Sequence, residues 1–206
     1  MLIIGLTGSI GMGKSTAATH FKALGIGVFD ADAAVHTLYA GRAVSLIEAA
    51  FPGTTNEGGV DRAKLAAVLG SSGDQFKRLE ALIHPLVRQA EREFLLVEHE
   101  LRATFAVLEV PLLFETGGHK RVDAAVVLST DVVTQRARVM ARAGMTVAKF
   151  EALLARQMSD ADKRGKADFV VDTTGRVTDT QAQINQILTQ LDGRAATAFH
   201  RHWETA

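Results

Sequence analysis

The chain of 206 residues contains no cysteine. This absence excludes disulfides, thiolate zinc sites and cysteine nucleophiles, and it agrees with a reducing compartment, so we expect a cytoplasmic protein. Neither charge sign is in excess, because Lys plus Arg and Asp plus Glu both number 23. No apolar stretch approaches the roughly 18 residues of a membrane span. We therefore expect neither nucleic acid nor a membrane as a partner, and the sequence gives no indication of the oligomeric state.

The hydrophobic content of 47% is typical of a globular protein, and the length suits one well-buried domain with insertions. The apolar run Met1–Thr7 lacks a basic segment and is interrupted by Gly5. It therefore predicts a core strand rather than a signal peptide.

Residues Gly8–Thr16 read GSIGMGKST and match G-x-x-x-x-G-K-[ST], the phosphate-binding loop (P-loop). A predicted strand precedes the loop, and residues 16–25 predict a helix that a glycine ends. This strand–loop–helix order is the one that the motif requires. The glycines allow backbone N–H groups to point at phosphate oxygens. We expect the phosphates of a nucleoside triphosphate to be bound by residues Gly11, Met12, Gly13, Lys14, Ser15 and Thr16. Lys14 would reach the β- and γ-phosphates, and the Ser15 hydroxyl would ligate Mg²⁺.

Two carboxylates follow the second predicted strand, residues 26–29. If the chain stays extended, Asp30 and Asp32 point to the same side, beyond a strand end where ligands bind in α/β folds. Alternatively, each aspartate caps the helix that follows.

Residues 33–104 are predicted to be helical and to hold the second substrate. Apolar residues Val44, Ile47 and Phe51 recur at helical spacing, and Asp61 is the expected N-cap of a helix over 62–69. Residues 51–59 predict a loop. Pro85 is expected in the first turn of a helix that reaches about residue 102.

Buried strands are predicted over residues 105–110, 124–128 and 169–171, and an amphipathic helix over 178–191. Runs this apolar imply a parallel sheet with helices on both faces. The segment 194–206 is expected to be a loose tail or a short helix. We divide the chain into a core (1–32, 105–130 and 167–193), the helical region 33–104, a lid (131–166) and the tail 194–206.

The predicted lid is an arginine-rich pair of helices, over 131–144 and 146–158. Its apolar residues Val132, Val139, Met140 and Ala143 share one face. Arg138 and Arg142 are four residues apart and are expected on the opposite face, where they would contact phosphate. Arg136 falls within the apolar stripe, so its side chain snorkels or the helix is irregular there.

These motifs, in this order, resemble the dephospho-CoA kinase family. The resemblance covers residues 2–191 and includes Asp30-Ala31-Asp32, His84-Pro85, the segment PLLFE at 111–115, Gln135 through Arg142, Gln157 and Ala167-Asp168. It implies a five-stranded parallel P-loop core, a helical substrate domain and a lid. It also implies transfer of the γ-phosphoryl group of ATP to the ribose 3′-hydroxyl of dephospho-CoA, the last step of coenzyme A synthesis.

The resemblance implies that Asp32 is the general base and that Lys14, Arg138 and Arg142 stabilise the transferring group. Asp30 could take the place of Asp32. His84 and Glu115 are candidate acceptor contacts, and both could equally be structural. Thr173-Thr174 stands where the family usually has asparagine, so an adenine contact there is not carried over. Met12 replaces the usual serine, which we expect to matter little because the loop acts through its backbone.

Two other functions fit part of the pattern. Another small-molecule P-loop kinase, such as a nucleoside monophosphate kinase, would share the loop, the lid and Mg²⁺. A nucleotide-dependent switch protein would share the loop alone, but the N/T-K-x-D stretch that guanine specificity requires is absent.

Overall fold

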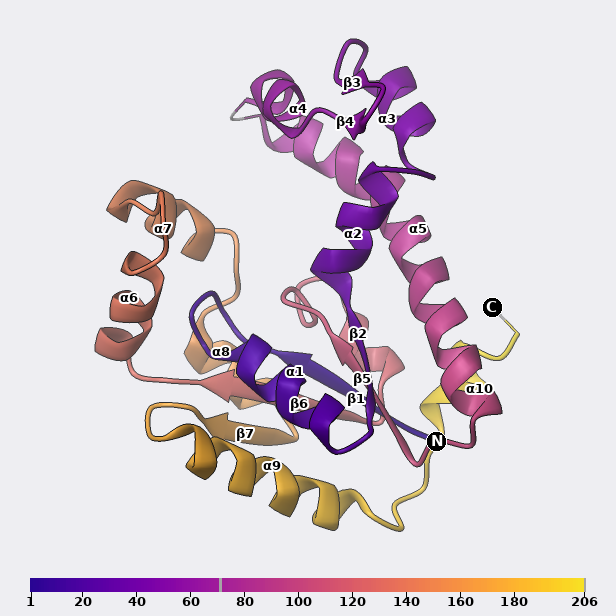
Figure 1. The fold of residues 1–206 in the computed structure, drawn as a ribbon, viewed down its shortest axis with the longest axis vertical. Coiled ribbons are helices and arrows are strands. Elements are labelled where there is room, and N and C mark those ends of the chain that lie inside the picture. Colours follow the sequence, from indigo (N-terminus) through magenta and orange to yellow (C-terminus); the bar gives the residue numbers. More distant parts are fainter. Residues whose placement is uncertain (71, 206) are drawn as a thin grey trace. The chain divides into compact units, whose positions relative to one another are not determined.

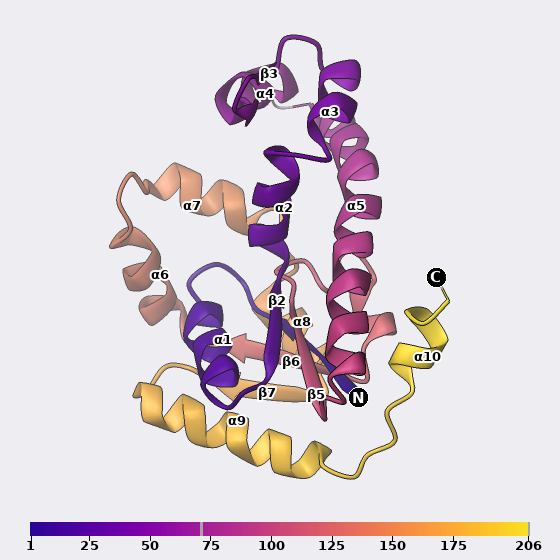
Figure 2. The same ribbon diagram turned by 45° about the vertical axis from the view of Figure 1, so that its right-hand side comes forward.

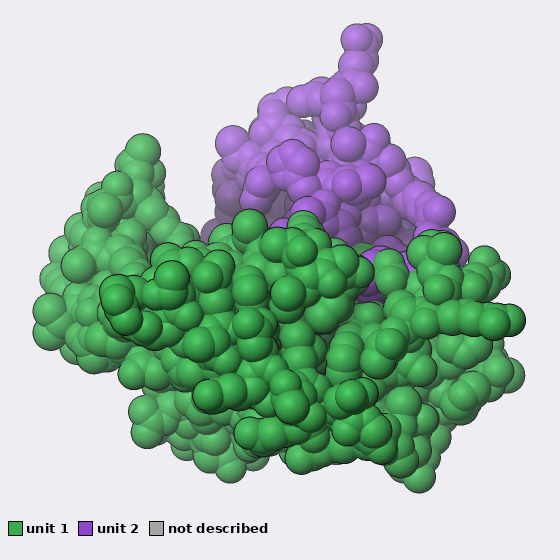
Figure 3. All heavy atoms as spheres, turned by 60° about the horizontal axis from the view of Figure 1, so that its bottom comes forward, with its two compact units in different colours: residues 1–29, 95–206 green, residues 30–94 purple. Residues whose placement is uncertain are grey.

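A computed structural model of the protein describes residues 1–70 and 72–205. It divides into two compact units: unit 1 comprises Met1–Phe29 and Leu95–Ala206, and unit 2 comprises Asp30–Phe94 (Figure 3).

A five-stranded parallel sheet has the strand order β2-β5-β1-β6-β7, with β1 at its centre (Figure 1). Its strands are β1 (Leu2–Thr7), β2 (Gly27–Asp30), β5 (Phe105–Glu109), β6 (Ala124–Ser129) and β7 (Phe169–Asp172). Each predicted strand is confirmed to within two residues at either end. In such sheets ligands bind beyond the carboxyl ends of the strands, and the P-loop follows the central strand.

Helices of unit 1 cover both faces of the sheet. The helices that lie wholly in this unit are α1 (Lys14–Ala23), α6 (Val132–Met140), α7 (Val147–Leu154), α8 (Asp160–Lys166), α9 (Val177–Leu191) and α10 (Ala198–His202), with the 3₁₀ helix η1 (Gly118–Arg121). Alternation along β6 explains the two layers, because Val126 and Leu128 join the cluster that includes Phe21 of α1 and Ile184 of α9, whereas Val127 packs with the loop after β5. Figure 2 shows α1 and α9 together along the sheet.

The C-terminal segment is docked rather than loose. Phe199 and Trp203 are buried, and Trp203 Nε1 donates to the carbonyl of Arg121 at 2.9 Å. The carboxylate of Asp123 joins this segment to β1: Oδ2 accepts from Ile3 N–H at 2.8 Å, and Oδ1 accepts from the N–H groups of residues 197 and 198 at 2.7 and 2.9 Å.

Unit 2 is built around its own helical core. It contains α2 (Ala31–Tyr39), α3 (Val44–Ala50), α4 (Arg62–Leu69) and the first part of α5 (Gly73–Glu100). The core includes Ile47 and Phe51. Asp61 caps α4 as predicted, because its carboxylate accepts from the N–H groups of residues 63 and 64. The predicted loop 51–59 contains part of a small antiparallel hairpin of β3 (Thr55–Asn56) and β4 (Gly59–Val60).

The predicted position of Pro85 in a first helical turn is wrong. Pro85 lies inside α5, which begins at Gly73 and continues to Glu100. A proline there removes one helical hydrogen bond. The apolar stripe nevertheless continues across it, since Leu79 and Ile83 before Pro85 and Leu86 after it pack against the same core. Burial of this stripe therefore maintains the helix where the local signal predicts a boundary.

No helix in residues 1–70 and 72–205 has both the length and the apolar composition of a membrane span.

Candidate functional site

The P-loop joins β1 to α1 and has the backbone that the motif predicts. Gly11 and Gly13 adopt φ values of 82° and 85°, in the left-handed region that favours glycine. A Cβ at Gly11 would also lie 2.6 Å from Val139 Cγ2, so space and backbone both require glycine. Gly13 is the N-cap of α1 and has no side chain to satisfy the first N–H groups of the helix. Those groups and the helix dipole favour an anion at this point.

Lys14 and Met12 are oriented by contacts around the loop. Lys14 Nζ donates to the Gly8 carbonyl at 2.8 Å, so the ammonium group lies across the loop. Met12 is buried, and its Sδ accepts from Thr130 N–H at 3.1 Å. The side chain of Met12 therefore helps to join the loop to the end of β6, although the sequence suggested that only its backbone matters.

Asp30 and Asp32 occupy different positions around the start of α2. The chain is not extended through both, and the capping alternative is confirmed for Asp30. Asp30 is the N-cap, and its Oδ1 accepts from Ala33 N–H at 3.0 Å. Asp32 is exposed in the first turn, where the helix dipole stabilises a carboxylate. The chain turns into the helix at Asp30 because the hydrogen bond from Ala33 N–H to the Asp30 carboxylate stabilises the first helical turn over an extended conformation. A proton-accepting role for Asp32 stays a prediction.

The buried face of α6 differs from the predicted apolar stripe. Gln135 and Val139 are the buried residues, whereas Val132 is 76% exposed. Arg136 is exposed, which resolves its awkward place in the stripe. The helix turns its polar residue Gln135 inward because the P-loop offers it a hydrogen-bond partner, Ile10. Hydrophobic spacing alone could not reveal this face.

Arg138 and Arg142 are placed differently. Arg138 is half-buried and donates twice to Thr173, from Nη1 to the hydroxyl at 3.1 Å and from Nη2 to the carbonyl at 2.6 Å. The Thr173 hydroxyl lies 3.2 Å from the carbonyl of Met12 and 3.2 Å from that of Ser129. Arg138 is thus fixed beside the P-loop rather than on an outer face. Arg142 is exposed and lies just beyond the end of α6, so the predicted helix is shorter there and the two arginines do not share one of its faces.

Thr173 is the residue that sequence reasoning missed. It is buried and follows β7, in the turn where the resemblance leads one to expect asparagine. The departure from the pattern was the available signal. Its hydroxyl links the loop, β6 and Arg138, so it supports this edge of the site.

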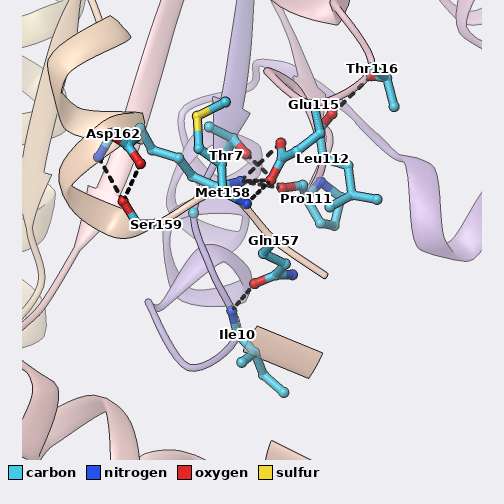
Figure 4. Close-up of polar contacts among 12 residues, drawn as sticks. Thr7, Ile10, Pro111, Leu112, Glu115, Thr116, Gln157, Met158, Ser159 and Asp162 are labelled. Carbon is cyan, nitrogen blue, oxygen red and sulfur yellow. Dashed lines mark hydrogen bonds and ion pairs between the residues drawn. The ribbon is translucent and has the colours of Figure 1, made fainter. Parts of the chain in front are cut away.

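Two glutamines hold the backbone of Ile10 in the P-loop. Gln135 Nε2 donates to the Ile10 carbonyl at 2.8 Å. Gln157 Oε1 accepts from the Ile10 N–H at 3.2 Å, the contact shown in Figure 4. Gln135 is in α6, and Gln157 lies between α7 and α8. Two separate segments of the predicted lid (131–166) therefore contact one residue of the loop.

Glu115 lies beside the second of these contacts. Its Oε1 accepts from Met158 N–H at 2.7 Å and lies 2.9 Å from Nζ of the fully buried Lys163 (Figure 4). Lys163 also donates to the carbonyl of Pro111 at 2.8 Å. These contacts give Glu115 a structural place. An acceptor contact by Glu115 stays a prediction.

A third helix, α8, follows the two that the sequence predicts for the lid. Ser159 is its N-cap and accepts from Asp162 N–H, while the Ser159 hydroxyl donates to Asp162 Oδ2 at 2.6 Å. The S-x-x-D spacing is a helix-start signal and could have revealed it.

His84 lies within α5 of unit 2 and is half-buried. Neither its position nor its burial distinguishes an acceptor contact from a structural role, so that role stays a prediction.

The start of α1 offers one protein oxygen that could bind an Mg²⁺ ion together with a nucleotide. In the described part of the chain, no three His, Asp or Glu side chains gather as a ligand set. Mg²⁺ commonly binds to phosphate oxygens, water and one or two protein oxygens. The exposed hydroxyl of Ser15, in the first turn of α1, offers such an oxygen.

Two carboxylates near the lid are held ionised by hydrogen bonds. The side chain and then the N–H of Thr134 bond to Asp131, which caps α6, and lower the pKa of its carboxyl. The side chain and then the N–H of Thr174 do the same for the pKa of Asp172. Both carboxylates stabilise local backbone at the ends of elements.

Comparison with known proteins places this site in a family. The family model described as "Dephospho-CoA kinase" matches residues 2–179. A dephospho-CoA kinase from Rhodopseudomonas palustris is 55% identical over 91% of this chain and 94% of that protein. Another from Rhizobium etli is 51% identical over 98% of this chain and 100% of that protein.

Solved structures agree with the fold. A crystal structure of a Thermus thermophilus protein has a TM-score of 0.79 and 34% identity, over 93% of this chain and 98% of its own. A dephospho-CoA kinase from Campylobacter jejuni has a TM-score of 0.62 and 22% identity, over 92% of this chain and 96% of its own, and shows the fold alone. Together with the P-loop geometry, these matches show that the chain belongs to the dephospho-CoA kinase family and is an ATP-dependent kinase.

Proposed function

We propose that the residues described above carry out the family's reaction, phosphorylation of the ribose 3′-hydroxyl of dephospho-CoA by ATP, with Asp32 as the proton acceptor. The observation that carries this assignment is the separation of roles around α2. Asp30 is the N-cap at the end of β2, and Asp32 lies exposed in the first turn, where its carboxylate is accessible to an acceptor.

In the proposed step, the 3′-oxygen attacks the γ-phosphorus in line with the bond to the β-phosphate. The new P–O bond forms as the bond to the β-phosphate oxygen breaks, and ADP leaves. Asp32 takes the proton of the hydroxyl as its oxygen becomes bonded to phosphorus.

The chain's cations neutralise the charge that develops on the phosphoryl oxygens. Lys14, together with the N–H groups at the start of α1, would bind the β- and γ-phosphates. The exposed Arg142 would close over the phosphates, while Arg138, held by Thr173, lines the nucleotide site. The Ser15 hydroxyl would ligate Mg²⁺, which supplies further charge neutralisation when bound.

We assign acceptor binding to the helical region 33–104 and a covering role to the lid, 131–166. His84 is a candidate contact of the acceptor within the first of these. We place the reaction in the cytoplasm, because a chain without cysteine suits a reducing compartment.

The deciding experiment is an assay with ATP, Mg²⁺ and a panel of acceptors, followed by location of the new phosphate by NMR. We expect phosphorylation of dephospho-CoA at the 3′-oxygen. Turnover of nucleoside monophosphates without dephospho-CoA would assign the chain to that other kinase class. Slow hydrolysis that only a protein partner stimulates would support a switch protein.

A further inference from the structure

We propose that Gln135 and Gln157, here called the glutamine pair, are positioning residues that set the direction of the P-loop amides. The inference rests on the nucleotide site of the proposed function and not on the identity of the acceptor. Its starting point is that both glutamines contact the backbone of a single loop residue, Ile10.

The chemistry of each glutamine matches the group that it contacts. The Ile10 carbonyl can only accept and the Ile10 N–H can only donate, so the first needs an amide nitrogen and the second an amide oxygen. Gln135 supplies Nε2 and Gln157 supplies Oε1. A glutamine amide provides either group without adding charge beside the triphosphate.

Peptide geometry turns the contact of Gln135 into a constraint on the next residue. The Ile10 carbonyl and the Gly11 N–H belong to one peptide, and no peptide bond in the described chain is cis. In a planar trans peptide the C=O and N–H point in opposite directions. A carbonyl held toward Gln135 therefore turns the Gly11 N–H away from α6.

The packing of α6 shows which side that is. A Cβ on Gly11 would lie 2.6 Å from Val139 Cγ2 and 3.1 Å from the Gln135 carbonyl, so the helix fills one side of the loop. The Gly11 N–H faces the other side, where we place the phosphates. Gly11 has a φ of 82°, and a glycine can adopt many backbone conformations at little cost. The hydrogen bond from Gln135 therefore selects one orientation of the peptide between Ile10 and Gly11.

Gln157 constrains the preceding peptide in the same way. It holds the Ile10 N–H, and the Ser9 carbonyl of that peptide accepts from Met12 N–H at 3.2 Å. Gln157 is itself anchored, because the next residue, Met158, donates its N–H to Glu115, which pairs with Lys163. The two peptides around Ile10 are thus held by two separate segments of the lid, α6 and the connection between α7 and α8.

The test is ATP binding, measured by calorimetry with ATP and Mg²⁺ and without an acceptor. Methionine has nearly the length of glutamine but makes no amide hydrogen bond. We expect Gln135→Met and Gln157→Met each to raise the Kd for ATP about tenfold, roughly 1.4 kcal/mol. Because both glutamines act through Ile10, the increase in the Kd for ATP of the double variant should be smaller than the product of the two single-variant increases.

Two controls separate this effect from others. Gln190→Met, at an exposed position of α9, makes the same chemical change far from the loop in sequence and should keep the parent's Kd. Lys14→Ala should abolish tight ATP binding. If Lys14→Ala leaves the Kd for ATP unchanged, the nucleotide site of the proposed function is wrong. If Lys14→Ala raises the Kd as expected but the methionine variants do not, only the role of the glutamine pair is overturned.

An NMR readout distinguishes positioning from general support of the fold. In the parent, ATP should shift the Gly11 amide proton downfield, and this shift should shrink in Gln135→Met. A Kd within twofold of the parent together with an unchanged Gly11 shift would overturn the proposal. If the buried substitution at Gln135 prevents folding, the half-buried Gln157→Met provides the same test through its Kd for ATP.

Discussion

Nζ of Lys163 lies 2.9 Å from Oε1 of Glu115, and the exposed fractions of the two side chains are 0% and 19%. The ammonium group therefore depends on this carboxylate and on the Pro111 carbonyl, whereas the carboxylate can still reach water.

This difference in exposure predicts which of the two substitutions lowers the free energy of unfolding more. Glu115→Gln leaves a buried ammonium without its counter-charge and should lower the free energy of unfolding by about 3 kcal/mol, more than Lys163→Met. The double variant Lys163→Met with Glu115→Gln should be more stable than Glu115→Gln alone, because no buried charge remains. Urea denaturation measures all three. Equal losses in both single variants would show that the burial difference has no energetic consequence.

The Thr173 hydroxyl predicts a second effect. Thr173→Val keeps the shape of the side chain but removes its bonds with Arg138 and with the carbonyl of Met12 or Ser129. We expect a loss of about 1–3 kcal/mol in stability and a higher KM for ATP. Thr173→Ser retains the hydroxyl and should behave like the parent in steady-state assays. A valine variant with a normal KM would separate Thr173 from nucleotide binding.

Asp30 and Asp32 should separate stability from chemistry. Asp30→Ala removes the cap of α2 and should lower the free energy of unfolding by about 1 kcal/mol, whereas Asp30→Ser should retain a cap. Both variants should keep the kcat of the parent. Asp32→Asn should lower kcat by about 10²–10⁴-fold with an unchanged Kd for ATP. Thermal unfolding measures the stability of each variant, and initial rates measure its kcat. If Asp30→Ser is inactive and Asp32→Asn is not, Asp30 is the proton acceptor.

Asp131 predicts a pH dependence of stability. Its pKa in the folded protein is lowered below an ordinary value of 3.8, chiefly by the Thr134 side chain. A lowered pKa contributes stability that is present above the unfolded pKa and is lost as the pH falls through the folded pKa. Asp131→Asn keeps an oxygen for the N–H groups of residues 133 and 134 but does not titrate there.

We therefore expect the stability advantage of the parent over Asp131→Asn to be fully present above the unfolded pKa of about 3.9 and to be lost as the pH falls through the lowered folded pKa. Denaturation at a series of pH values measures this difference. A constant difference across the range would show that the cap acts without its charge.

The sequence predicted those features that local chemistry controls. The P-loop motif fixed the turn between β1 and α1, Asp61 identified the start of α4, and the apolar runs identified the strands of the sheet. In each case the residues that determine the structure lie within a few positions of it.

The features that the sequence missed depend on distant partners. Gln135 turns inward only because Ile10, 125 residues earlier, offers a carbonyl, and Arg138 is fixed by Thr173. Pro85 stays within α5 because the core of unit 2 holds the residues on either side of it. The spacing of apolar residues along the sequence carries no information about such distant contacts.

The carboxylate of Asp123 has a consequence for local opening of the protein. It accepts from Ile3 N–H of β1 and from the N–H groups that lead into α10. Release of α10 would free one side of this carboxylate and uncover the ring of Phe199, now stacked on His99 with ring centres 4.2 Å apart. The hydrogen-exchange rate of a single amide, that of Ile3, should consequently report the detachment of a helix almost two hundred residues further along the chain.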